Sequence, residues 1–83
     1  MSEPIESAPN IGKELGRRLR EVGITTHAAL KRTGDAKAFA KLVARFPEDA
    51  CTHTRLALAG AVRGVRWMQL PQELRDALKK EVP

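Results

Sequence analysis

Apolar residues recur at helical spacing in five segments of this 83-residue chain, and each segment has a recognisable start or stop. The clearest pattern is Phe39, Leu42, Val43 and Phe46, which lie at i, i+3, i+4 and i+7 ahead of Pro47. No run of alternating apolar and polar residues is long enough to seed a sheet. The pattern predicts an all-α fold: a single compact domain of about five short helices.

The predicted helices run from about residue 12 to 22, from 26 to 32, from 35 to Pro47, from a cap at Asp49 or Thr52 to Gly64, and from Leu70-Pro71 onward. The fourth segment is rich in alanine and contains Gly60, so neighbouring helices can approach it closely. We expect it to be the central, most buried helix.

The first eight residues carry two acids, a proline and two serines without periodicity. This composition indicates a flexible leader over residues 1–8, followed by the helical domain over residues 9–83. Because only this short leader precedes residue 9, the sequence provides too few residues for a full helix there.

A phosphate-binding turn is the most informative local feature. Asn10, Ile11 and Gly12 lead into a basic helix, whose first free amides and positive dipole end can face an anion. Lys13, Arg17 and Arg20 share one face of that helix. Residues 11–34 hold six basic and two acidic side chains, which is +4 of the net charge of +5. The alternative is a solvated charged face whose arginines pair with Glu14 and Glu21.

Several landmarks give the chain a family resemblance. The turn at residues 10–12, with small Gly16 and then Leu19, resembles a helix-hairpin-helix motif, and Val22-Gly23-Ile24-Thr25-Thr26 often follows such a hairpin. Together with residues 58–64 and the run Trp67-Met68-Gln69-Leu70-Pro71, these landmarks resemble the C-terminal domain of the TfoX/Sxy competence-regulator family. The resemblance implies a helical domain with a helix-hairpin-helix or SAM-like N-terminal half, in a bacterial protein that regulates DNA uptake.

The expected function is a non-catalytic regulatory module with weak, nonspecific contact to DNA backbone through Asn10, Ile11, Gly12, Lys13, Arg17 and Arg20. No recognition helix for base readout is visible. The alternative is a protein-interaction or dimerisation module that uses Trp67 and Met68. Its partner would be a regulatory protein, an N-terminal TfoX-type domain or a second copy. A third interpretation is an orphan domain without a partner, and the sequence leaves the oligomeric state open.

Other classes of function have little support in the sequence. Cys51 and His53 offer two metal ligands where zinc requires four, so we expect no metal and no cofactor. No nucleophile has a recognisable base nearby and there is no P-loop, so we expect no enzyme. Without an apolar leader or a membrane span, the chain is expected to be cytoplasmic, with Cys51 as a small buried residue.

Overall fold

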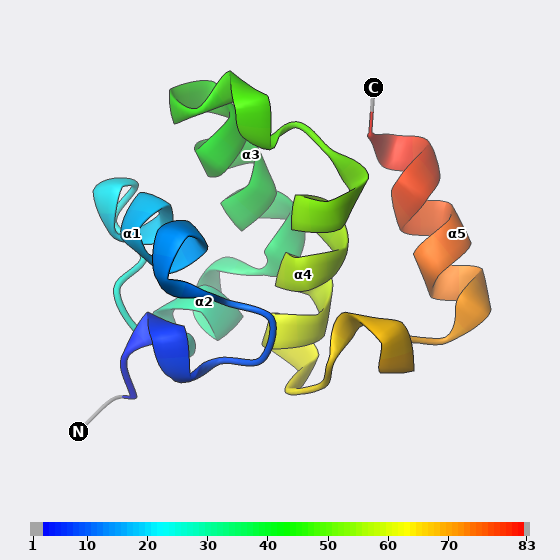
Figure 1. Cartoon of the computed structure of the whole chain (residues 1–83), viewed down its shortest axis with the longest axis horizontal. Helices are drawn as coiled ribbons and strands as arrows, with labels where there is room; N and C mark the ends of the chain where they lie inside the picture. Colours follow the sequence, from blue (N-terminus) through cyan, green and yellow to red (C-terminus); the bar gives the residue numbers. More distant parts are fainter. Residues whose placement is uncertain (1–2, 83) are drawn as a thin grey trace.

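The alanine-rich segment forms the central helix, and the other helices pack on two of its faces (Figure 1). The computed structural model describes residues 3–82. Its α-helices are α1 (Lys13–Glu21), α2 (His27–Thr33), α3 (Asp35–Arg45), α4 (Thr52–Arg63) and α5 (Gln72–Glu81). The 3-10 turn η1 (Ile5–Ser7) precedes α1, and the 3-10 turns η2 (Pro47–Asp49) and η3 (Trp67–Gln69) lie between α3 and α4 and between α4 and α5. The all-α prediction is confirmed for the residues described.

Two hydrophobic clusters lie on opposite sides of α4. The larger cluster joins η1 and the first three helices to one side of α4, through Leu58 and Ala61. The smaller cluster joins the other side to the C-terminal segment, through Leu56, Ala59, Leu70 and Leu78. Figure 1 shows α5 on that second side, apart from α1, α2 and α3. The α4 segment is therefore buried on both sides, as its small residues predicted.

Most of the predicted helix boundaries are confirmed to within a residue or two. The Thr26 hydroxyl caps α2 by accepting a hydrogen bond of 3.0 Å from the Ala29 amide. Gly64 ends α4 in the left-handed conformation, with φ of 73°.

The predicted cap of α4 is wrong. Its N-cap is Cys51, which gives no side-chain cap bond. Cys51 is also exposed, although we expected it to be buried. Asp49 is instead buried in η2 and paired with Arg18 of α1. A cation from a distant helix outcompetes the local amides for this carboxylate, and local sequence cannot reveal that.

The flexible leader is also a wrong prediction for the part that the structure describes. Ile5 is fully buried in the larger cluster. The Ile5 amide donates to the Thr25 carbonyl at 3.1 Å, and the His27 amide donates to the Glu3 carbonyl at 3.0 Å. One isoleucine and two backbone bonds dock this segment, so the domain begins before residue 9. Residues 1 and 2 of the predicted leader lie outside the described part.

The aromatic residues lie at the margins of the two clusters. Phe39 and Phe46 are half-buried against the larger cluster, and Trp67 is half-buried against the smaller one. Met68 is 55% exposed. In α5, Leu74 and Leu78 pack in the smaller cluster, whereas Ala77 is exposed. None of the helices between residues 3 and 82 has the length and apolar character needed to cross a bilayer.

Candidate nucleic-acid interface

In the turn at residues 9–12, the residue with an unusual backbone angle is Asn10. Asn10 has φ of +69°, in the left-handed region that asparagine tolerates better than most residues. Gly12 has φ of −85° and ψ of −175°, which is extended backbone open to other residues. The turn therefore depends on the left-handed conformation of Asn10 rather than on Gly12.

The side chain of Asn10 points into the protein. Its Oδ1 accepts from the Trp67 amide at 3.0 Å, and its Nδ2 donates to the Val65 carbonyl at 3.0 Å and the Ala57 carbonyl at 3.3 Å. A Cβ on Gly60 would lie 2.5 Å from that Nδ2, so α4 needs a glycine at this point. Because all three bonds are internal, the Asn10 side chain has a structural role and is not available to DNA.

The backbone amides after Asn10 are of two kinds. One is hydrogen-bonded within the turn, and the others have no partner in the protein among the residues described. The Ile11 side chain is buried and its amide donates to the Ala8 carbonyl at 3.3 Å, so Ile11 does not face a ligand. The helix α1 has Gly12 as its N-cap and no side-chain cap bond. Its first helical backbone bond runs from the Gly16 amide to the Gly12 carbonyl at 2.9 Å. Within residues 3–82, the amides of Lys13, Glu14 and Leu15 thus have no backbone partner and are left for water or a ligand.

The predicted basic stripe of α1 consists of Lys13, Arg17 and Arg20. Acidic side chains already pair with two of these three residues. Arg17 pairs with Glu14 at 3.3 Å and with Glu21 at 2.6 Å. Arg20 pairs with Glu6 at 2.5 Å, and its hydrogen bond is the main reason that the pKa of Glu6 lies below its usual value. The third member, Lys13, is exposed and forms no ion pair with any residue in the described range. Lys13 is thus the cation of the stripe whose charge is not locally compensated.

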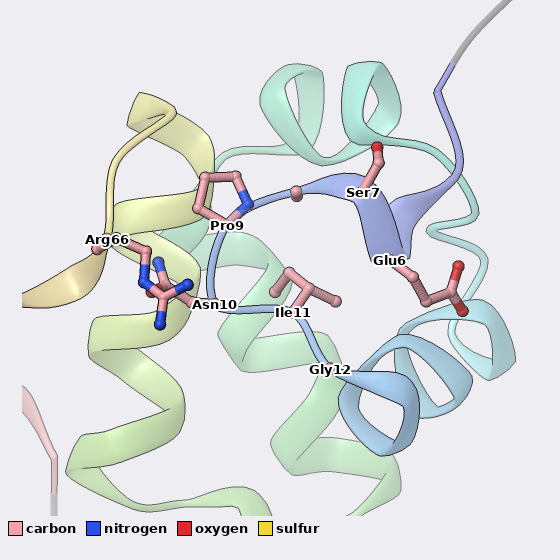
Figure 2. A pocket seen from close by; sticks show the side chains of 8 residues that line it. Glu6, Ser7, Pro9, Asn10, Ile11, Gly12 and Arg66 are labelled. Carbon is pink, nitrogen blue, oxygen red and sulfur yellow. The ribbon is translucent and has the colours of Figure 1, made fainter.

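The turn separates two hollows on the surface. The first extends from Glu6 along the turn to Arg66, and Figure 2 shows Arg66 beside Asn10 at one end and Glu6 at the other. Sequence reasoning missed Arg66, because nothing local shows that the segment before η3 returns to the N-terminal turn. This hollow offers one cation and one anion.

The second hollow lies between the start of α1 and the side of α4. Three side chains that can carry positive charge line it: Lys13, Arg18 and His53. Arg18 was not among the residues expected to contact DNA, and His53 was expected at most to be a metal ligand. No pattern in the sequence brings α1 and α4 together at this point, since 40 residues separate Lys13 from His53.

The second predicted surface is small. Trp67 is half-buried and meets His53 edge-on, with ring centroids 6.3 Å apart. Among the residues that the structure describes, Met68 beside it is the large apolar side chain most exposed to solvent. Within residues 3–82, no group of three or more potential ligand side chains is arranged to hold a metal ion.

Between residues 3 and 82 the fold defines a class: a small, compact all-helical domain of five α-helices. The sequence model of the TfoX C-terminal domain matches residues 1–82. The chain belongs to this family.

Two solved structures are similar to the chain over nearly its whole length. The triclinic crystal form of an uncharacterized protein from Listeria monocytogenes superposes with a TM-score of 0.89, at 35% identity, covering 95% of this chain and 89% of that one. The tetragonal form of a Listeria monocytogenes protein of unknown function gives a TM-score of 0.85, at 36% identity, covering 94% of each chain. No match was found among curated proteins.

Proposed function

We propose that this domain is a non-catalytic regulatory module of a bacterial cytoplasm that contacts the DNA backbone weakly and without sequence specificity. The contact surface is the start of α1, with its open amides and Lys13. Regulation of competence is the role that family membership suggests, because the TfoX/Sxy family is one of competence regulators.

The observation that carries the proposal is the uncapped start of α1 beside an uncompensated lysine. Helix amides and a nearby cation favour a phosphate oxygen. The net charge of +5 adds a long-range attraction to any polyanion. The ion pairs of Arg17 and Arg20 lower the number of charges available, so few phosphates can be neutralised and the affinity is expected to be micromolar or weaker.

The test is fluorescence anisotropy of a labelled duplex at two salt concentrations. Neutralising three or four phosphates gives a log–log slope of roughly −3 to −4, so affinity should fall roughly 60- to 250-fold between about 50 and about 200 mM salt. The double variant K13E/R17E should lose the salt-sensitive signal.

The matched control is K37E/K41E, which makes the same charge change at two exposed lysines of α3. Circular dichroism checks that both variants stay folded. If the wild type does not bind at low salt, or if both double variants lose affinity equally, the proposed contact surface is wrong.

A protein-interaction or dimerisation surface at Trp67 and Met68 is the second candidate, favoured by the exposure of Met68. Its partner would be a second copy, a regulatory protein or an N-terminal TfoX-type domain. Sedimentation velocity over a concentration range tests the second copy. Met68→Ser should abolish any association while leaving the fold intact, since 55% of Met68 is already in solvent. Sedimentation as a monomer at every concentration would contradict dimerisation.

A further inference from the structure

We infer that the hollow between α1 and α4 seats a phosphate group of the bound nucleic acid, with Arg18, Lys13 and His53 around it. This inference rests on the proposed function and places the main phosphate contact in the hollow rather than on the outward face of α1. The outward stripe of α1 becomes secondary, and α4 becomes part of the binding surface.

Arg18 is the residue whose geometry best supports phosphate binding. Its Nη1 donates to Asp49 Oδ1, and Asp49 is only 3% exposed. The buried carboxylate holds the guanidinium, whose side chain is 24% exposed, at the wall of the hollow. A guanidinium has five N–H donors, and the contacts within residues 3–82 engage only Nη1. The remaining donors are available to a phosphate, which arginine recognises well.

Lys13 and His53 complete the set from two different helices. Both side chains are exposed and both line the hollow, Lys13 from the first turn of α1 and His53 from the first turn of α4. Because Arg18 and Asp49 together are neutral, Lys13 supplies the net positive charge. His53 presents ring nitrogens for a hydrogen bond, and its ring lies edge-on to Trp67.

The other polar groups around the hollow are compatible with an anion. Glu14 also lines it, but its carboxylate accepts a hydrogen bond of 3.3 Å from Arg17 on the outer side of α1. Thr54 lies deeper and is buried, with its hydroxyl 3.2 Å from the Cys51 sulfur. No uncompensated acid therefore faces Lys13 across the hollow among the residues described.

The stripe and the hollow make different predictions for single changes. His53→Glu places a carboxylate in the hollow without touching the stripe, and should weaken duplex binding on the order of tenfold or more. Ala40→Glu introduces the same charge at an exposed position of α3 and should change affinity by no more than about twofold. Arg17→Gln, on the stripe, should likewise have little effect.

Titration of the isotope-labelled wild-type chain with inorganic phosphate supplies an independent readout by NMR. Amide shifts should concentrate at Lys13, Glu14, His53 and Thr54, and should be absent from the variant His53→Glu.

The outcomes separate the two proposals. If K13E/R17E loses duplex binding while His53→Glu binds like the wild type, the proposed function stands and the hollow is not its phosphate seat. If phosphate shifts the residues of the hollow but no duplex binds, the hollow is an anion site and the DNA function is wrong. If neither ligand binds, both are overturned. Loss of duplex binding in His53→Glu alone, with folded controls, supports the inference.

Discussion

At the scale of single residues, Asn10 joins three distant parts of the chain. Its left-handed backbone forms the turn, and its side-chain amide bonds to α4, to Val65 two residues beyond α4, and to η3. Among the backbone bonds described, the Trp67 amide and the Val65 carbonyl have no other partner, and leaving such a group unpaired costs more than an average hydrogen bond contributes. The start of α1 is therefore positioned against α4 by one polar side chain.

Two substitutions of Asn10 distinguish the contribution of its left-handed backbone from that of its side-chain hydrogen bonds. Asn10→Gly keeps the left-handed turn but loses the three hydrogen bonds, and should lower the free energy of unfolding by about 2–4 kcal/mol. Asn10→Ala loses the bonds and adds backbone strain, which costs about 1–2 kcal/mol more. Urea denaturation followed by circular dichroism measures both. Equal stability of the two variants would mean that the backbone angle of Asn10 carries no cost.

At the scale of helices, a buried ion pair connects α3 to α4 and extends to α5. Arg55 of α4 is 4% exposed, and its guanidinium lies 2.7 Å from Asp35 at the start of α3 and 3.1 Å from Glu81 at the end of α5. Burial of Asp35 raises its pKa, but the hydrogen bond and charge of Arg55 outweigh that effect and bring the pKa below the usual 3.8. The two partners of Arg55 differ in exposure, at 17% for Asp35 and 55% for Glu81.

This difference predicts unequal effects of the two neutralising substitutions. Asp35→Asn leaves a buried guanidinium short of a charge partner and should cost about 1–3 kcal/mol of unfolding free energy. Glu81→Gln removes an exposed partner and should cost less than about 1 kcal/mol. Chemical denaturation at neutral pH measures both, and a larger loss for Glu81→Gln would contradict the assignment.

The lowered pKa of Asp35 also predicts an acid-sensitive contribution to stability. The carboxylate is favoured in the folded state, so its contribution is fully present above its ordinary pKa of about 3.8 and is lost as the pH falls through the lower folded-state pKa. Unfolding free energies measured from about pH 5 down to about pH 2 should decrease in the wild type and decrease less steeply in Asp35→Asn. Parallel pH profiles would show that Asp35 has the same pKa in both states.

At the scale of the whole molecule, α4 packs against two hydrophobic cores of unequal size. The larger core takes residues from η1, α1, α2, α3 and α4, whereas the smaller core joins α5 and its connection to the far side of α4 alone. The α5 segment has few long-range partners, so it should open without unfolding the rest.

Native-state hydrogen exchange tests this division of the fold. Amides of α5 should exchange faster than those of α4, and Leu78→Ala, which removes a buried side chain of the smaller core, should increase the difference. The control Leu30→Ala, in the larger core, should instead lower protection throughout the chain. Equal protection of α4 and α5 in the wild type would contradict a separable α5.

The sequence by itself determined the all-helical class, the approximate extents of five helices, the glycine end of α4 and the central place of its small residues. These features depend on local spacing, capping and residue size. Only the tertiary structure decided that Ile5 docks the N-terminal segment, that Asn10 turns inward, and that Asp49 is buried against Arg18. It also brought Lys13 and Arg18 of α1 to the same hollow as His53 of α4. Such pairings join residues far apart in the chain, and their geometry follows from how the helices pack around α4 rather than from any neighbouring residue.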